Sequence, residues 1–243
     1  MTVEVIPVHG IPEIRPGDDL ALLLLQALDS SSLLLQRNDV VVVTQKAVSK
    51  SEGRVVPEMP VGKRGWIERE TRRVVARRGD LVIAETRHGF VCANAGVDAS
   101  NVDEGFLTLL PEDPDATAER VRASLRRALD LDVGVVITDT FGRPWRRGVV
   151  NVAVGCAGLP ALLDLRGTKD ASGRVLEATV VAVADEVAAA SGLVMGKASG
   201  IPMAIVHGLS FDAPPAPARA LVRPSEEDLF RTGVLDPQDR TAG

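Results

Sequence analysis

Apolar and polar residues follow one another along the chain in patterns that predict both strands and helices. Short apolar or β-branched runs predict strands at residues 3–8, 39–44, 81–86, 90–93, 133–138, 149–154 and 202–206. Apolar positions at helical spacing predict helices at about residues 19–35, 117–129 and 182–193, with a further, strongly charged helix at 63–78. Because strands and helices mix without a strict β-α-β order, we expect an α+β fold with mixed, mostly antiparallel sheets flanked by helices.

The chain is expected to form one domain with a short extension. Residues 1–210 hold every predicted strand and helix, and neither an internal repeat nor a low-complexity linker divides them. Residues 211–243 are rich in Pro, Ala, Asp and Arg. We therefore expect this last segment to be a peripheral C-terminal tail of the same domain.

Composition limits the kinds of partner that the protein can have. Of its 243 residues 45% are hydrophobic and only 3% aromatic, which predicts an ample aliphatic core but no aromatic platform for nucleic-acid bases. The net charge of −5 argues against a general basic surface for nucleic acid or an anionic membrane. No signal-peptide pattern and no long uncharged apolar run is present, so we expect a cytoplasmic protein, with Cys92 and Cys156 buried and reduced.

An anionic ligand would therefore need local positive charge. The candidates are Lys46, Lys50, Arg143, Arg146, Arg147 and Lys197. Lys50 follows a predicted strand and would bind phosphate as a point charge, whereas Arg143 and its neighbours would either clamp an anion or form surface ion pairs. His88, at the tip of the hairpin predicted from residues 81–93, would either contact substrate or serve a structural role.

Two aspartates stand among small or hydroxyl residues beside apolar runs. Asp98 lies in NAGVDASNV and Asp139 in ITDTFGR, where Thr140 adds a hydroxyl oxygen. Hard oxygen ligands of this kind suit Mg²⁺ or Mn²⁺ bound to phosphates, and we expect both aspartates to meet at one ion. The alternative is that each is a turn aspartate that bonds its own backbone.

The familiar nucleotide-binding fingerprints are missing. The sequence contains neither G-x-x-x-x-G-K-[ST] nor G-x-G-x-x-G after a strand, so a P-loop and a Rossmann turn are both excluded. Taken alone, the residues do not choose among a metal-dependent ligase, a metal-dependent nucleotide phosphohydrolase and a non-catalytic binding protein.

Six segments, in order, give the chain a family resemblance. They are QKAVSKSEGR at 45–54, ETRHGFV at 85–91, NAGVDASNV at 94–102, ITDTFGR at 137–143, ADE at 184–186 and MGK at 195–197. With these segments the chain resembles the coenzyme F420-0:gamma-glutamyl ligase family, in a stand-alone form without a fused nitroreductase-like domain. The resemblance implies that residues 1–210 are the ligase domain.

The resemblance also implies an activity and a set of site residues. Members of the family use GTP and a divalent ion, Mg²⁺ or Mn²⁺, to join L-glutamate to F420-0, and then add γ-linked glutamates by way of an acyl phosphate. A homodimer is implied as well, and K⁺ is a further candidate ion. Asp98, Asp139 and Thr140 would hold the metal, and Asp98, Asp139 and Lys50 would be catalytic. The residues expected to contact nucleotide are Ile11, Pro12, Glu13, Ile14, Gln45, Lys50, Asn101, Met195, Gly196, Lys197, Ala198, Ser199, Gly200 and Ile201.

One position departs from the family pattern. Lys197 stands where archaeal members carry a glutamate that would help to hold a second metal. Either one metal suffices in this chain, or the ammonium of Lys197 takes over that charge.

Overall fold

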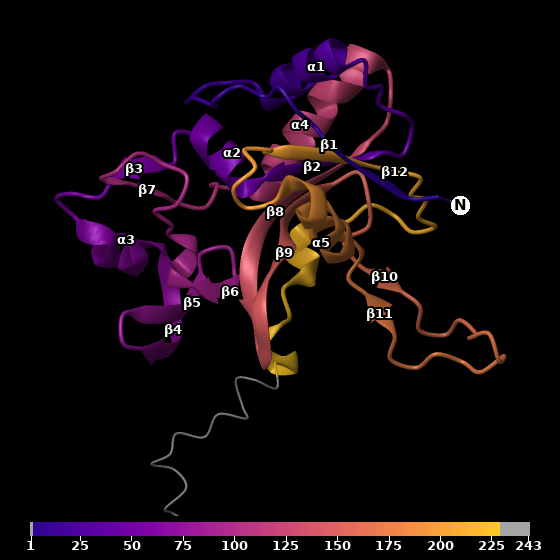
Figure 1. The fold of residues 1–243 in the computed structure, drawn as a ribbon. Coiled ribbons are helices and arrows are strands. Elements are labelled where there is room, and N and C mark those ends of the chain that lie inside the picture. The colour runs from indigo at the N-terminus through magenta and orange to yellow at the C-terminus, as the bar shows by residue number, and fades with distance from the viewer. Residues whose placement is uncertain (1, 229–243) are drawn as a thin grey trace, which may run out of the picture.

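A five-stranded mixed sheet forms the centre of the molecule. The structure, a computed structural model, describes residues 2–228. The strands lie in the order β1-β12-β2-β8-β9, and of these neighbours only β2 and β8 are parallel (Figure 1). Their bounds are β1 (Glu4–Pro7), β2 (Val40–Thr44), β8 (Gly134–Arg143), β9 (Arg146–Ala157) and β12 (Met203–His207).

Helices cover both faces of this sheet, which explains why β2 is apolar at successive positions. Val41 and Val43 pack under α1 (Leu20–Ser31), α2 (Gln45–Ser51) and α4 (Pro114–Leu129), whereas Val40 and Val42 pack under α5 (Val183–Met195). A strand buried on both faces reads as a continuous hydrophobic run. The core is therefore divided by the sheet into two apolar layers.

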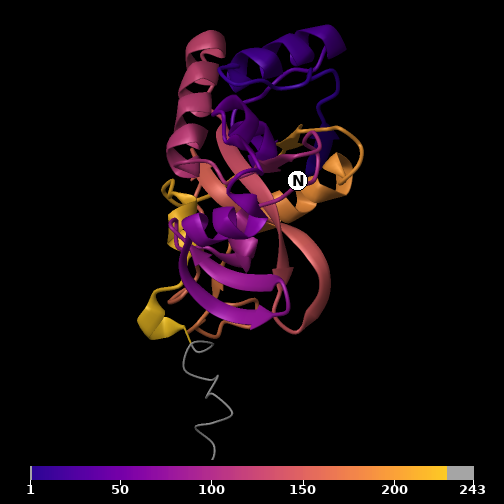
Figure 2. The same ribbon diagram turned by 90° about the vertical axis from the view of Figure 1, so that its left-hand side faces the viewer.

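A smaller lobe stands beside the sheet with a core of its own. It contains β3 (Val55–Pro57) paired with β7 (Phe106–Thr108), the helix α3 (Gly62–Glu70), and a three-stranded sheet of β4 (Thr71–Arg78), β5 (Leu81–Thr86) and β6 (Val91–Ala93). Ile67, Ala84 and Leu107 form the centre of this second core. Figure 2 shows the curved strands of the lobe below the helices of the main body.

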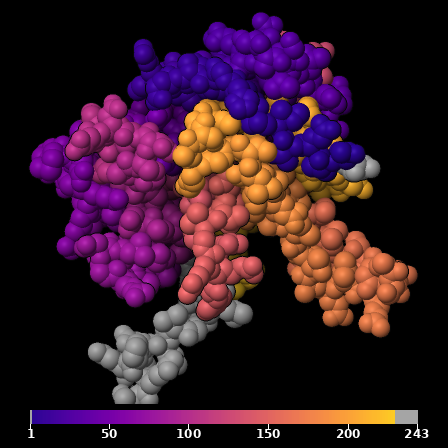
Figure 3. Space-filling view, in the orientation of Figure 1, coloured from indigo at the N-terminus to yellow at the C-terminus, as the bar shows by residue number. Residues whose placement is uncertain are grey.

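Two further segments extend from the main body. The short pair β10 (Leu163–Asp164) and β11 (Val180–Val181) begins a projecting arm, which Figure 3 shows standing apart from the lobe. Near the C-terminal end of the described residues, the 3₁₀ turns η2 (Ala218–Leu221) and η3 (Ser225–Glu227) follow β12. The buried Asp115 accepts hydrogen bonds from the Ala218 and Cys156 backbone N–H groups, at 2.7 and 2.9 Å, and so ties η2 to the sheet. Residues 229–243 of the expected tail lie outside the described residues, and the boundary at residue 210 stays a prediction.

The expected α+β class is confirmed, with mixed and mostly antiparallel sheets. Nearly all predicted strands and helices are present with shifts of a few residues at their ends; the strand of residues 81–86 has the predicted bounds, and β8 and β9 are several residues longer than predicted. Helix α4 begins at Pro114 rather than at residue 117, because the side chain of Asp113 accepts from the Ala116 N–H at 3.0 Å. No helix among residues 2–228 is long and apolar enough to cross a membrane.

The helix predicted at residues 63–78 is wrong in its second half. The charged stretch 63–78 is helical only up to Glu70, and residues 71–78 form the edge strand β4. Pairing with β5 decides the conformation: Arg73 lies opposite Glu85, and its Nε donates to that carboxylate at 3.1 Å. The arginines of residues 72–78 are exposed, and they lie on a strand and not on a helix.

Candidate functional site

A cavity of about 680 Å³ lies between α2, the start of the β8–β9 hairpin and the C-terminal end of α5. It gathers residues from segments that are far apart in the sequence. The predicted site residues that line it are Ile11, Pro12, Glu13, Ile14, Gln45, Lys50, Asn101, Asp139, Thr140, Met195, Gly196, Lys197, Ala198, Gly200 and Ile201.

Four predicted site residues do not line the cavity. Asp98 stands beside it and hydrogen-bonds the lining residue Lys46. The Ser199 hydroxyl donates to the Met195 carbonyl. Arg143 is exposed near the tip of the hairpin, where its guanidinium donates to the Arg147 carbonyl at 3.4 Å.

His88 is held inside the small lobe rather than in the cavity. Its Nε2 lies 2.9 Å from the Pro111 carbonyl oxygen and 3.1 Å from that of Glu112, so this nitrogen carries the proton that is donated to them. Its ring stacks on Phe90 with the centroids 5.7 Å apart. These contacts fit a structural role for His88, and its expected contact with substrate gains no support from the geometry.

Helix α2 brings two lysines to the cavity. It begins directly after β2, with Thr44 as its cap, and places Lys46 and Lys50 four residues apart on one face. The Lys50 ammonium lies 2.5 Å from a carboxylate oxygen of Glu13, and the Lys46 ammonium lies 2.5 Å from Oδ2 of Asp98. Each lysine therefore rests on a carboxylate that was itself predicted to belong to the site.

Asp98 is the more solvated of the two predicted metal ligands. Its Oδ1 accepts from the Ser100 N–H at 3.0 Å and its Oδ2 from the Ser100 hydroxyl at 2.7 Å. Burial raises its pKa, but the hydrogen bonds from Lys46 and Ser100 and the charge of Lys46 outweigh it, and the pKa falls to about 2. The bond to its own backbone two residues on shows that Asp98 is a turn aspartate as well as a ligand candidate.

The pKa of Asp139 is shifted in the opposite direction to that of Asp98. Asp139 stands in β8, half-buried, and accepts from the Thr140 N–H at 2.8 Å. Burial raises its pKa to about 6, against the lowering effect of that hydrogen bond and of the charges of Lys197 and Lys46. The charge of Asp98 adds to the increase, so the two aspartates and two lysines form one interacting group.

The donor set fits a magnesium-like ion that is completed by substrate. Among residues 2–228 no three His, Cys, Asp or Glu side chains are placed to hold a metal. Mg²⁺ is typically held by one or two carboxylates, with the rest of its shell supplied by water and substrate phosphates. Asp98 and Asp139 with the oxygen of Thr140 suit that arrangement, and the shared ion stays a prediction.

Thr140 is itself positioned by a residue that the sequence did not single out. Its hydroxyl donates to Oδ1 of Asn151 at 2.9 Å, across the β8–β9 pair. Asn151 lines the cavity, and Gly192 of α5 allows close approach there, because a Cβ on it would stand 3.0 Å from the Asn151 amide nitrogen. Only the pairing of the two strands could have revealed this residue.

The loop after α5 closes one side of the cavity. Gly196 and Gly200 have φ angles of +58° and +66°, a region that favours glycine. Lys197, between them, is exposed, lines the cavity and lowers the pKa of Asp139 through its charge. The departure from the family pattern is therefore located where it bears on the metal ligands.

The α+β fold and this lysine-bearing cavity fit a protein with a small-molecule site that uses neither a P-loop nor a Rossmann turn. The model of the F420-0:Gamma-glutamyl ligase family matches residues 10–208, and the chain belongs to this family. A coenzyme F420:L-glutamate ligase of Methanothermobacter thermautotrophicus is 41% identical to it, over 95% of this chain and 100% of that protein. Proteins of the same name from Methanopyrus kandleri and Archaeoglobus fulgidus are 41% and 40% identical, over 95% of this chain and 98% and 97% of their own lengths.

Proposed function

We propose that the protein is a GTP-dependent ligase that joins L-glutamate to F420-0, adds further glutamates through γ-linkages, and releases GDP and phosphate. One observation carries the proposal: in a chain 41% identical to a ligase of that name, Asp139 and the lysines of α2 line one cavity, and Asp98 is bonded to one of these lysines. Cations and hard oxygen ligands at one place are what phosphoryl transfer needs.

The reaction would proceed in two balanced steps. In the first, a carboxylate oxygen of F420-0 attacks the γ-phosphorus of GTP, the bond to the β-phosphate oxygen breaks, and GDP leaves. In the second, the amine of glutamate attacks the acyl carbon, the carbon–oxygen bond to phosphate breaks, and the nitrogen loses a proton. Phosphate is a better leaving group than the hydroxide that an unactivated carboxyl group would have to release. The carboxylate is therefore phosphorylated before the amine attacks.

The chain's own residues would orient the reactants and neutralise charge. Lys50 and Lys197, which line the cavity, would bind phosphate oxygens, and Gln45 would contact the nucleotide while the Ser49 hydroxyl, 2.8 Å from its Oε1, holds its amide. Asp98, Asp139 and Thr140 would hold Mg²⁺ or Mn²⁺, which supplies positive charge to the transferring phosphoryl group. Homodimer formation and a role for K⁺ are further proposals that rest on the resemblance, and a cytoplasmic location is one that rests on the sequence pattern.

A single reaction tests the activity. Purified protein is incubated with F420-0, GTP, Mg²⁺ and L-glutamate, and the products are identified by mass spectrometry. We expect F420 species with one or more added glutamates, together with one GDP for each glutamate. Loss of GTP without any need for glutamate would favour a phosphohydrolase. Binding of F420-0 without product, in both the parent protein and Asp98→Ala, would favour a non-catalytic deazaflavin-binding protein.

A further inference from the structure

The Lys46 ammonium is bonded to the loop that contains Asp98 and Ser100. This ammonium lies 2.5 Å from Oδ2 of Asp98 and 2.9 Å from the Ser100 carbonyl oxygen, and it also contacts the Ser100 hydroxyl. A lysine ammonium has three donors, and here all three point at residues 98–100, which are more than 50 positions away in the sequence. The side chain of Lys46 is 16% exposed and that of Asp98 is 42% exposed, so the ion pair is only partly open to solvent.

The carboxylate of Asp98 has little capacity left for a metal. Oδ2 accepts from Lys46 and from the Ser100 hydroxyl, and Oδ1 accepts from the Ser100 N–H. A carboxylate offers about four acceptor positions, so roughly one remains. A divalent ion bound at about 2.1 Å to this carboxylate would stand close to the ammonium, and two cations on one carboxylate repel.

Lys46 also faces the cavity in which a phosphate group is expected to bind. It lines the space that also contains Lys50, Asp139 and Lys197, and its charge already lowers the pKa of Asp139. Its neighbour Lys50 is different, because its partner Glu13 is 74% exposed and that ion pair is open to solvent. Among the described ion pairs of α2, the Lys46–Asp98 pair is thus the one that stands between a predicted metal ligand and the cavity.

We infer that Lys46 is a positioning residue that exchanges partners during the reaction cycle. With the site empty, its ammonium neutralises Asp98 and holds the loop of residues 98–102 in place. When a divalent ion binds to Asp98, the ammonium moves to a phosphate oxygen of the nucleoside triphosphate. The metal and the nucleotide then favour each other's binding, because each removes the cost of displacing Lys46. This inference rests on the proposed function, since it takes a nucleoside triphosphate as ligand.

The exchange makes a prediction that a purely structural tether does not make. If Lys46 competes with the metal, removal of its charge strengthens metal binding in the absence of nucleotide. If Lys46 only fastens the loop, removal of its charge loosens Asp98 and weakens metal binding. The sign of one change in affinity separates the two.

The experiment compares Lys46→Met with the parent protein and with Lys169→Met, an exposed position on the projecting arm. Binding of Mn²⁺ is measured by electron paramagnetic resonance, with and without a non-hydrolysable GTP analogue. We expect Lys46→Met to bind Mn²⁺ alone about tenfold more tightly than the parent, and the strengthening of Mn²⁺ binding by the analogue to shrink about tenfold. Lys169→Met should match the parent in both titrations.

An equal or weaker affinity of Lys46→Met for Mn²⁺ alone would overturn the exchange. If this variant does not fold, as judged by circular dichroism, Lys46→Arg replaces it. Its guanidinium keeps the charge and grips a carboxylate through two donors, so Mn²⁺ alone should bind no more tightly than in the parent. Tighter binding by Lys46→Arg would overturn the exchange. The ligase assay on the parent protein judges the proposed function separately, because no titration here depends on product formation.

Discussion

At the scale of single residues, environment gives two aspartates opposite chemistry. Asp98 has a pKa of about 2 and Asp139 one of about 6, although both are predicted ligands of one ion. Asp98 is in contact with the ammonium of Lys46, whereas the half-buried Asp139 accepts a hydrogen bond from the Thr140 backbone N–H. Ionisation of Asp139 therefore lowers the stability of the folded protein unless a cation is bound nearby. Shifted pKa values of this kind are common for groups in functional sites.

Asp139→Asn should change how stability depends on pH. The folded-state pKa of Asp139 is raised from 3.8 to about 6, so ionisation is harder in the folded protein than in the unfolded chain. Below pH 4 the group is protonated in both states and costs nothing; as the pH rises through 6 the stability falls, by up to about 3 kcal/mol. Without divalent ions, Asp139→Asn should therefore melt at a higher temperature than the parent at pH 8, and the difference should be much smaller at pH 4.5, where the loss has only begun. A difference that does not vary with pH would contradict this.

Lys50→Ala should weaken nucleotide binding without unfolding the protein. A charge-assisted hydrogen bond to phosphate contributes about 1.5–3 kcal/mol, so we expect the dissociation constant for GTP, measured by calorimetry, to rise roughly 10- to 100-fold. The melting temperature should barely move, because the partner of Lys50 in the empty site is the exposed Glu13. Lys169→Ala serves as the matched control. Unchanged GTP affinity in a normally folded Lys50→Ala would remove this lysine from the nucleotide site.

At the scale of elements, the sequence predicts best where local pattern and tertiary packing agree. β2 is a continuous apolar run because it is buried on both faces, and β5 has the bounds that its pattern predicts. Helix α2 was not predicted, because its seven residues are too few to display a helical period. The second half of the predicted helix 63–78 became β4 because pairing with β5, which no local pattern reveals, determines it.

The same limit applies to the candidate site. Most of the expected nucleotide-binding residues line the cavity, but they were named from the family resemblance and not from periodicity or spacing. The contact between Lys46 and Asp98 joins positions 52 apart, and the Thr140–Asn151 bond depends on the register of β8 against β9. Such contacts follow from the tertiary fold, so the sequence could supply the residue types but not their pairing.

Gly155→Ala should strongly destabilise the junction between β9 and α4. A Cβ at this position would stand 2.4 Å from the Pro114 carbonyl oxygen and 2.6 Å from its carbon, and backbone atoms cannot yield as a flexible side chain can. We expect a loss of about 3 kcal/mol in the free energy of unfolding, measured with urea. Gly142→Ala, in the neighbouring strand β8, is the control: nothing lies within 4 Å of its added Cβ, so its stability should remain near that of the parent. Equal stabilities would show that the junction can relax.

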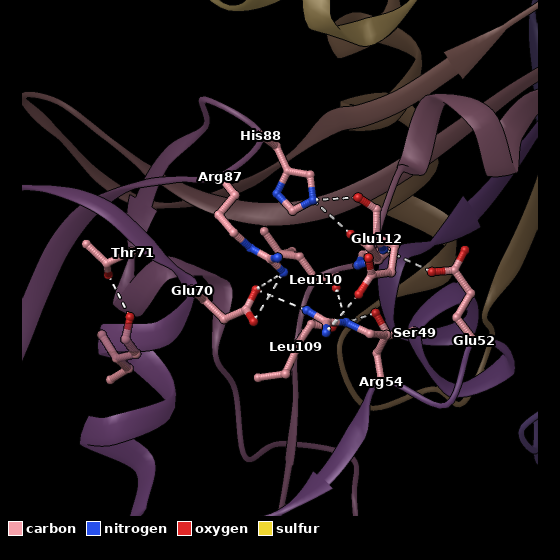
Figure 4. Close-up of polar contacts among 12 residues, drawn as sticks. Ser49, Glu52, Arg54, Glu70, Thr71, Arg87, His88, Leu109, Leu110 and Glu112 are labelled. Atoms are coloured by element: carbon pink, nitrogen blue, oxygen red, sulfur yellow. Dashed lines mark hydrogen bonds and ion pairs between the residues drawn. The ribbon is translucent and has the colours of Figure 1, made fainter. Parts of the chain in front are cut away.

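At the scale of the whole molecule, the two predicted metal ligands belong to different parts of the fold. Asp139 stands in the central sheet, whereas Asp98 follows the turn η1 (Asn94–Gly96), which packs on the small lobe. A buried ionic network joins this lobe to the main body (Figure 4). At its centre the Glu70 carboxylate accepts from Arg54 at 3.0 Å and from Arg87 at 3.1 Å.

The network spans segments that are distant in the sequence. Arg54 follows α2 and also donates to the Leu110 carbonyl at 3.0 Å, while its other guanidinium nitrogen lies 3.2 Å from Glu112. Glu70 closes α3, and Arg87 stands in the β5–β6 hairpin. We therefore expect the orientation of the lobe, and with it the distance from Asp98 to Asp139, to depend on the Glu70 carboxylate, whose side chain is only 7% exposed.

Glu70→Ala should loosen the lobe and, through it, the metal site. Removal of the buried Glu70 leaves the half-buried Arg54 with only the exposed Glu112 as a carboxylate partner, which costs up to about 3–5 kcal/mol. We expect faster hydrogen exchange in residues 71–98 and weaker binding of Mn²⁺ in the presence of a GTP analogue, because Asp98 is no longer held at a fixed distance from Asp139. Glu68→Ala is the matched control on the same helix, since Glu68 is 58% exposed and pairs only with the exposed Arg64 in the structure. If both variants exchange and bind Mn²⁺ alike, the network does not set the geometry of the site. Faster exchange with unchanged Mn²⁺ binding would instead show that the position of Asp98 does not depend on the network.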